Sequence, residues 1–502
     1  MQKRLEKYFF ISVISVLHLL YFAIQYGIST DNHFNVWTAA KLYPALALSE
    51  GYDLYECDIG PVLLTQYGPG SPLFYLSSCF GSSPEISIWI ACILNTFSIL
   101  TMMWFIFGKR NNSFQNTISI FIGFAFIFMI VAERTTYSLF QIHHDLPVLV
   151  YLFIGSVFLL SKRTRKNFAY QTLGYSFIWM AVWTKIVALP WLFLPIIHRL
   201  MYKDFYNYKN LSTTIYSLLG TGISCTLIFS FFFGFSDIWF HLFESTNTYP
   251  WRDAKSLFGN NNELLVSNNF LSKIVVLLKI SFFYFTDYWW LVISCLLIFL
   301  QNFTNKENPI LSWLILIYFL SVPTCLAALS KFGGVDNSLV FAHVPAYAAI
   351  FLKITHIFKT LTLSNFLKFS IAMTITLLPL INSLRIASSL LKDTSNSPNQ
   401  LAYEYLLKNP KKPVFFALAP LPNFFLTGKI SSAGEALTYT TMMSQDSLPK
   451  NAGLEFMQNT NLIAFGNPPY SRSYFDRKLN LTKIVSPVGL EDWNVYEAKR
   501  KE

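Results

Sequence analysis

Long apolar stretches, separated by short polar segments, make up most of this chain. A transmembrane helix needs about 20 mostly apolar residues, and about eleven stretches approach or exceed that length. They are 9–28, 87–108, 116–132, 146–161, 168–184, 186–198, 211–233, 284–301, 309–330, 338–357 and 363–385. The pattern predicts an α-helical polytopic membrane protein with about eleven transmembrane helices.

The apolar region 168–198 divides into two crossings because basic residues flank both of its ends, at 162–166 and at 199–203. Lys and Arg concentrate in cytoplasmic loops, so both ends of the region lie inside the cell. Pro190 and Pro195 fall in the second crossing, where proline removes a backbone donor. We therefore expect a tilted or broken helix at 186–198.

If the N-terminus lies in the cytoplasm, the other short basic segments fall on the cytoplasmic side as well. They are 109–110, Lys306 and 353–359. The opposite, extracytoplasmic face carries the segments 29–86, 133–145, 234–283, 331–337 and, after an odd number of spans, 386–502. Apolar residues at helical spacing in 34–49 and 268–283 predict helices that lie along the membrane surface.

The composition changes near residue 386, where Pro, Asn, Ser and Lys become frequent. We predict a transmembrane domain at 1–385, with the long external loop 29–86, and a small C-terminal α/β extracytoplasmic domain at 386–502. The second domain has strand-like runs at 413–418 and 461–465 and a helical pattern at 399–408.

The charge content of the sequence indicates which kind of partner the chain binds. Only 13% of the residues are charged and 53% are hydrophobic, whereas soluble domains average about 25% charged. The net charge of +11 comes largely from Lys and Arg in short loops, so the partner is the lipid bilayer and not nucleic acid. The sequence contains no P-loop or dinucleotide fingerprint, which argues against ATP-driven transport. Cys57 and Cys79 share one external loop and either form a disulfide or stay as two thiols.

Acidic residues stand at two exits from the membrane. Asp31 directly follows the first span, where a carboxylate can act as a general base, hold a cation or cap a helix. Asp145 opens the fourth span, after His143 and His144. Such charged groups near lipid either pair with one another or face an aqueous cavity. Adjacent histidines without HExxH-type spacing are weak evidence for a metal site.

Two lysines lie at the same depth. Lys185 ends the fifth span and Lys41 falls in the expected surface helix. Each either binds a lipid phosphate or extends its ammonium group toward water. Asp336 and Asn337 follow a Gly-Gly turn at the start of a later span, where they could line a cavity.

The order of these features resembles the GT-C superfamily of membrane glycosyltransferases, which take sugars from polyprenyl-phosphate carriers. The resemblance covers about the first 350 residues. It includes Asp31 after the first span, the aromatic-proline string at 66–75 (QYGPGSPLFY), Asp145, and the loop 333–337 (GGVDN) before the helix that contains Pro345. Members of the protein-mannosyl and lipid A arabinosyl branches commonly carry paired acidic residues at the first position. Here Asn32 follows Asp31, which leaves the branch and a divalent cation open.

The resemblance implies a GT-C-like enzyme, a hexosyl or pentosyl transferase of the cell envelope. It would move a sugar from a polyprenyl-phosphate carrier to a hydroxyl on a glycan, lipid or protein, with inversion, on the outer face of a bacterial cytoplasmic membrane. It implies Asp31 as the base, Asp145 as a second catalytic residue, and Lys185 and Lys41 at the donor phosphate. The substrate cavity would include His143, His144, Tyr67, Asp336 and Asn337.

Two other functions stay open. One is a polysaccharide flippase or repeat-unit polymerase, which would be expected to place polar residues in mid-span and, for a transporter, to show internal repeats. The other is a non-catalytic membrane subunit whose external domain binds a partner.

Overall fold

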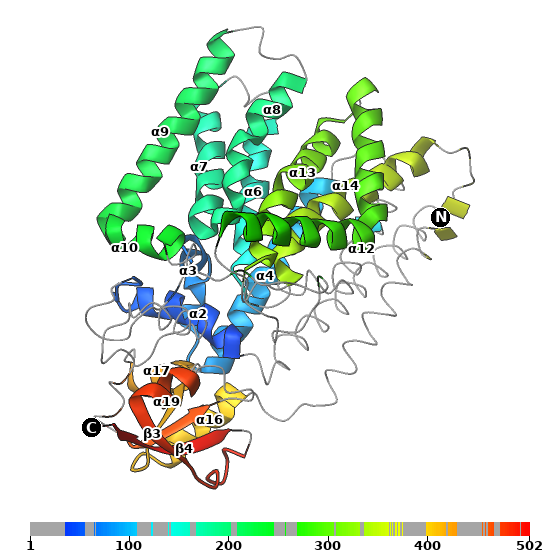
Figure 1. Cartoon of the computed structure of the whole chain (residues 1–502). Coiled ribbons are helices and arrows are strands. Elements are labelled where there is room, and N and C mark those ends of the chain that lie inside the picture. The colour runs from blue at the N-terminus through cyan, green and yellow to red at the C-terminus, as the bar shows by residue number, and fades with distance from the viewer. Residues whose placement is uncertain are drawn as a thin grey trace, which may run out of the picture.

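Helices account for most of the described chain (Figure 1). The computed structural model describes residues 36–55, 65, 67–107, 122–123, 139, 142–160, 167–201, 208–244, 251, 257, 269–305, 308–331, 336–360, scattered positions in 362–374, 398–417, 420–428, 454, 457, 460–465, 472–491 and 493–501. The predicted span 9–28 and most of 116–132 and 363–385 lie outside these residues, and so does Asp31. The count of about eleven spans therefore stays a prediction.

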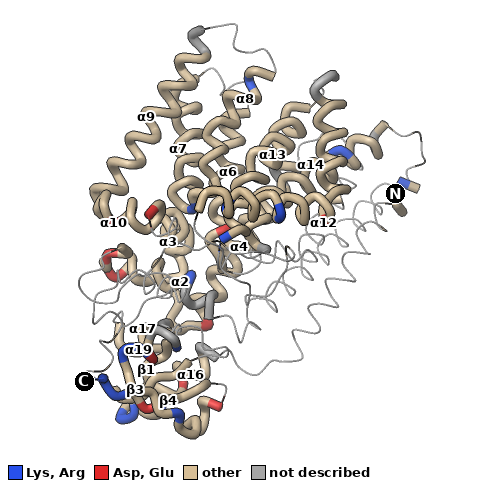
Figure 2. The backbone as a smooth tube through the Cα atoms, viewed as in Figure 1, with Lys and Arg blue, Asp and Glu red and all other residues tan. Residues whose placement is uncertain are grey.

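Five helices within the described ranges are long and apolar enough to cross a membrane, so the chain is an integral, multi-pass membrane protein. These spans are Pro84–Met103, Leu211–Phe233, Phe270–Asn302, Pro309–Leu329 and Asn337–Phe358. They belong to α4 (Pro84–Phe107), α9 (Tyr208–Phe233), α12 (Phe270–Asn305), α13 (Pro309–Leu329), and η6 (Asp336–Leu339) with α14 (Val340–Thr360). Figure 2 shows few charged residues along these helices.

The shorter apolar helices α6 (Asp145–Leu160) and α7 (Phe168–Thr184) pack closely against each other. A Cβ added to Gly155 of α6 would lie 2.7 Å from the carbonyl oxygen of Gly174 in α7. Small residues at such a crossing let two backbones approach closely in a membrane. This packing fixes the start of α6 beside the end of α7.

The predicted break after residue 184 is present. Lys185 has an extended backbone (φ −153°, ψ 121°) that ends α7, and the next segment begins as a 3-10 helix, η3 (Ile186–Phe193), that contains Pro190. An α-helix, α8 (Leu194–Met201), follows. Proline cannot donate its backbone nitrogen to a helix, which accounts for the interrupted geometry.

The helix α12 bends at Tyr288, whose backbone is not helical (φ −120°, ψ 23°). Figure 1 shows its first half lying across the upright helices and its second half standing among them. The crossing half presents apolar side chains to the outside, among them Leu278 and Phe282. The bend lies near the predicted boundary between 268–283 and a span from 284, and the position of the first half along the membrane surface stays a prediction.

Short helices also form a layer next to the spans. It contains α2 (Val36–Ser49), α3 (Gly70–Phe74), η1 (Leu76–Phe80), α10 (Phe235–Trp239) and the π-helical turn η5 (Phe240–Glu244). The predicted helix at 34–49 is therefore confirmed as a helix. Cys79 is a free thiol that donates to the carbonyl oxygen of Ala45 (3.4 Å), whereas Cys57 lies outside the described residues.

The C-terminal residues form a small mixed sheet with the order β1-β2-β4-β3. The strands are β1 (Val414–Ala417), β2 (Leu462–Phe465), β3 (Leu479–Lys483) and β4 (Asn494–Arg500), and the helices are α16 (Pro398–Lys408), α17 (Pro420–Thr427) and α19 (Arg472–Lys478). β1 and β2 are parallel, and β4 runs antiparallel to both β2 and β3. The predicted strands at 413–418 and 461–465 and the helix at 399–408 are confirmed. The helix α17 packs on α2, where the rings of Phe424 and Tyr43 lie 6.2 Å apart.

Candidate active site

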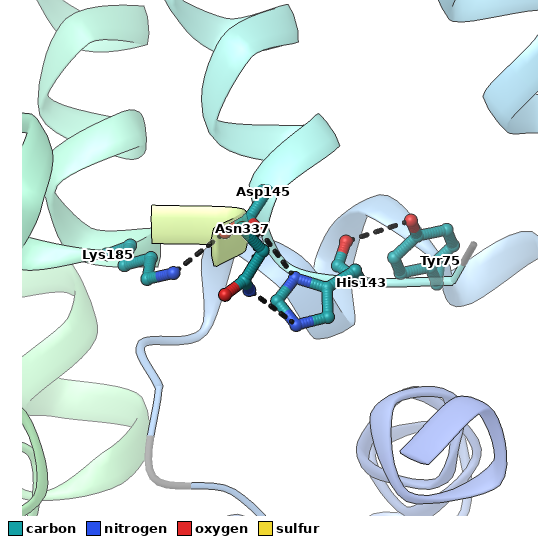
Figure 3. Close-up of polar contacts among 5 residues, drawn as sticks. All are labelled: Tyr75, His143, Asp145, Lys185 and Asn337. Atoms are coloured by element: carbon teal, nitrogen blue, oxygen red, sulfur yellow. Dashed lines mark hydrogen bonds and ion pairs between the residues drawn. The ribbon is translucent and has the colours of Figure 1, made fainter. Parts of the chain in front are cut away.

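The ends of three apolar helices meet at one point of the molecule (Figure 3). Asp145 is the first residue of α6, Lys185 follows the last residue of α7, and Asn337 lies in the turn that leads into α14. Because each of these residues lies at the end of an apolar helix, their polar side chains lie where the apolar helices end and the layer of shorter helices begins. This depth suits a ligand that is half lipid and half polar.

The buried carboxylate of Asp145 is held by three polar side chains. The Lys185 ammonium donates to Oδ1 (2.8 Å), the Asn337 amide donates to Oδ2 (3.1 Å), and Nδ1 of His143 lies 3.0 Å from Oδ2. Asp145 is fully buried and the Lys185 side chain is 11% exposed. Opposite charge and hydrogen-bond donors favour the ionised carboxylate at such a site.

The two ring nitrogens of His143 face different partners. The Asn337 amide nitrogen lies 3.3 Å from Nε2, which can accept its proton, while Nδ1 faces the carboxylate. A neutral ring with its proton on Nδ1 fits this pattern. Burial lowers the pKa of His143, nearby Lys41 and Lys185 lower it further, and Asp145 opposes them.

The backbone of His143 is anchored from a different part of the chain. The Tyr75 hydroxyl lies 3.1 Å from the His143 carbonyl oxygen and 3.0 Å from Oδ1 of Asn95, in the span α4 (Figure 3 shows the first contact). Tyr75 and Asn95 are both fully buried. A buried side-chain network of this kind restricts the position of the loop that carries His143.

Tyr67 brings a second lysine to the same place. Nζ of Lys41 lies 4.6 Å from the centroid of the Tyr67 ring and Nζ of Lys185 lies 5.6 Å from it, so both ammonium groups contact one aromatic ring. The ring of His144 packs against Tyr67 with its centroid 4.0 Å away. Lys41 is only 3% exposed. Lys185 also forms an ion pair with the Asp145 carboxylate.

The segment that carries Tyr67 packs directly on the end of α7. The Tyr55 hydroxyl donates to the Tyr67 carbonyl oxygen (2.7 Å), and the backbone nitrogen of Gly68 donates to the Thr184 carbonyl oxygen (3.3 Å). A Cβ on Gly68 would lie 1.3 Å from the carbonyl oxygen of Trp183, so only glycine fits there. The Gly-Pro-Gly string therefore sets the distance between Tyr67 and Lys185.

The structure gathers most of the residues that the sequence singled out into this one cluster. They are Lys41, Tyr67, His143, His144, Asp145, Lys185 and Asn337. Asp336 occupies the turn beside Asn337, and its side chain is outside the described set. Asp31 lies outside the described residues, so its role as a base stays a prediction.

A metal site does not emerge from the described part of the chain. Within it, no three His, Cys, Asp or Glu side chains converge in a way that could hold an ion. The divalent cation stays a prediction, because Asp31 lies outside that part.

Sequence reasoning did not single out three residues that support the cluster: Tyr55, Asn95 and Phe341. Nζ of Lys185 lies 5.2 Å from the centroid of the Phe341 ring. No local sequence pattern indicates this contact. Asn95 did carry a signal, because an amide inside an apolar span is costly unless it has a partner.

No protein-family model and no curated protein matches the sequence. Solved structures do match. ArnT from Cupriavidus metallidurans in the apo state has a TM-score of 0.53 and 12% identity, over 99% of this chain and 98% of ArnT. The apo oligosaccharyltransferase of Archaeoglobus fulgidus has a TM-score of 0.53 and 11% identity, over 96% of this chain and 70% of that chain. The chain has a GT-C-like fold.

The GT-C-like fold extends over almost the whole chain, including the small C-terminal sheet. ArnT from the same organism bound to undecaprenyl phosphate matches with a TM-score of 0.49 and 12% identity, over 97% of each chain. The two structures with TM-scores of 0.53 confirm, at the level of the fold, the resemblance inferred from scattered motifs.

Proposed function

We propose that this protein is a glycosyltransferase that moves a hexosyl or pentosyl group from a polyprenyl-phosphate carrier to a hydroxyl acceptor on the outer face of the membrane. The observation that carries the proposal is the pair of lysines, Lys41 and Lys185, on the ring of Tyr67 at the end of the spans. The GT-C-like fold supports it, since ArnT, which has this fold, binds undecaprenyl phosphate.

The lysine pair suits the phosphate of a lipid carrier. A polyprenyl tail partitions into the bilayer, so its phosphate lies at the interface, which is the depth of Lys185 after α7. Both ammonium groups are largely buried, and in a low dielectric their attraction for an anion is strong. Bond cleavage places negative charge on the leaving phosphate, which fixed cations stabilise.

In the proposed reaction Asp31 accepts the proton of the acceptor hydroxyl. The acceptor oxygen then forms a bond to the anomeric carbon while the bond from that carbon to the phosphate oxygen breaks, with inversion, and polyprenyl phosphate leaves. Asp145 does not need to act as a base. Its contacts with Lys185, Asn337 and His143 suit a residue that positions the phosphate-binding lysine.

Purified protein in lipid nanodiscs, given a panel of polyprenyl-phosphate sugars and hydroxyl acceptors, tests the proposal. We expect transfer by the unmodified chain, loss of about 100-fold or more in Asp31→Asn, and near-normal transfer in Asp287→Asn, a matched change at an exposed carboxylate. Equal transfer by Asp31→Asn and the unmodified chain would remove Asp31 as the base.

Binding of undecaprenyl phosphate gives a separate test of the lysines. We expect Lys41→Gln and Lys185→Gln each to weaken binding about tenfold, and Lys279→Gln, at an exposed position on α12, to leave it unchanged. If the chain instead moves a lipid-linked sugar across the bilayer without transferring it, the flippase alternative replaces this proposal.

A further inference from the structure

Basic side chains lie together at one end of the C-terminal sheet. The register aligns Val414 of β1 with Leu462 of β2, and Leu462 with Glu497 of β4. Residues just before β1 and residues at the end of β4 therefore lie at the same end of the sheet. The start of β3 also lies there, because Leu479 pairs with Arg500.

Basic residues lie in or next to the ends of three of the four strands here, β1, β3 and β4. The backbone nitrogen of Lys501 donates to the carbonyl oxygen of Lys478 (3.3 Å), which joins the end of β4 to the end of α19. We call the exposed basic residues at this end the basic rim: Lys411, Lys412, Arg477, Lys499, Arg500 and Lys501. Figure 2 shows blue segments of the tube near the C-terminus.

Few acidic groups offset the basic rim in the described part of the domain. Glu497 lies 3.9 Å from Lys499, and both side chains are exposed, at 44% and 72%. Asp476 is shared with Arg472, whose Nε lies 3.1 Å away. Exposed pairs of this kind contribute little, so the rim keeps a positive potential that extends over about one Debye length.

The position of the C-terminal sheet determines which class of anion can bind to the basic rim. The sheet lies on the far side of α2 from the upright spans (Figure 1), and the C-terminal helices α16 and α17 contact the rest of the chain at α2 and at α4. A layer of protein thus lies between the sheet that carries the rim and the upright spans. A repeated, water-soluble anion fits this position better than a membrane surface does.

We propose that the basic rim binds an anionic polysaccharide, whose carboxylate or phosphate groups repeat along the chain. Sheet neighbours lie about 5 Å apart, so basic groups on adjacent strand ends can meet successive charges of an extended polymer. This proposal concerns a surface outside the lysine cluster, and it stands whether or not the chain transfers a sugar.

Binding of the full-length protein in nanodiscs to fluorescently labelled polygalacturonate tests the proposal, with neutral dextran as the negative control. We expect Lys499→Glu to weaken binding about tenfold, because it reverses a charge within the rim. Lys483→Glu makes the same change at an exposed lysine on the other end of β3, and we expect little effect. The pair Lys411→Gln with Lys412→Gln tests whether the rim extends to β1.

Salt and alternative anions complete the test. Rim binding should weaken steeply as NaCl rises, because screening shortens the reach of exposed charges. Equal effects of Lys499→Glu and Lys483→Glu would overturn the proposal. It would also fail if vesicles of phosphatidylglycerol or a DNA duplex bound through the rim and polygalacturonate did not.

Circular dichroism and thermal melting of each variant separate lost binding from lost folding. Normal sugar transfer by the rim variants keeps this result distinct from the proposed function.

Discussion

Nζ of Lys185 lies 2.8 Å from Oδ1 of Asp145, and these residues come from opposite ends of two antiparallel apolar helices. The carboxylate is fully buried and the ammonium group nearly so. Such a pair is costly to form and more costly to break, because a lone buried charge has no solvent to compensate it. It therefore ties the end of α7 to the start of α6 and fixes a lysine at the membrane boundary.

Removal of the lysine charge should strongly destabilise the protein. We expect Lys185→Met to lower the free energy of unfolding by about 3 kcal/mol or more, since Asp145 stays buried without its cation. The double variant with Asp145→Asn should recover part of that loss. Thermal melting of the two single variants and the double variant measures the coupling. Strictly additive effects would show that the pair contributes nothing beyond its separate residues.

A side chain at Gly68 should separate the Tyr67 segment from α7. The added Cβ of Gly68→Ala would meet the carbonyl oxygen of Trp183 at 1.3 Å, so the backbone must move and the hydrogen bond to Thr184 is lost. We expect a lower melting temperature and weaker undecaprenyl phosphate binding. Gly220→Ala is the matched control, because nothing lies within 4 Å of its Cβ and alanine favours a helix. Equal melting temperatures for the two variants would contradict the close contact.

Acid should destabilise the protein through His241. Burial lowers its pKa to about 4, despite the hydrogen-bonding contact with the Tyr55 carbonyl oxygen (3.3 Å). Between the ordinary pKa of about 6.5 and this value the unfolded chain binds a proton that the folded chain does not. The free energy of unfolding therefore falls as pH falls through this window, by roughly 3 kcal/mol in all. His143, whose pKa is also lowered, acts in the same direction.

Melting temperatures measured from pH 7 to pH 4 test this dependence. His241→Gln keeps a donor for the Tyr55 carbonyl oxygen and removes the titration, so its melting temperature should fall less with acid. His356→Gln, at a partly exposed position, serves as the control. An unchanged slope in His241→Gln would show that another group causes the acid sensitivity.

The Tyr55 hydroxyl should matter for ligand binding more than for stability. Tyr55→Phe removes the hydrogen bond to the Tyr67 carbonyl oxygen, which costs about 1 kcal/mol. We expect the freed Tyr67 segment to weaken undecaprenyl phosphate binding several-fold with a small change in melting temperature. Tyr216→Phe removes a hydroxyl from an exposed position on α9 and should change neither. Unaltered affinity in Tyr55→Phe would show that Tyr67 is held by its other contacts.

Local patterns in the sequence predicted the helices well because hydropathy and proline act over short distances. The apolar run 309–330 gave α13 (Pro309–Leu329), and the prolines after residue 185 gave the change from 3-10 to α-helical geometry. The sequence also named Asp145 and Lys185 separately, since a charge at the end of an apolar run is visible without any neighbour. The strands at 414–417 and 462–465 followed from their runs of apolar residues.

Only the tertiary structure decided which of these residues meet. Asp145 and Lys185 are 40 positions apart, and Asn337 is 192 positions from Asp145. Their contacts depend on how α6, α7 and α14 pack, which is set by shape and by close approaches such as that of Gly155 to Gly174. The basic rim likewise depends on the strand order β1-β2-β4-β3, in which distant lysines become neighbours. Hydropathy fixes which segments enter the membrane, but the side-chain packing between those segments fixes the chemistry at their ends.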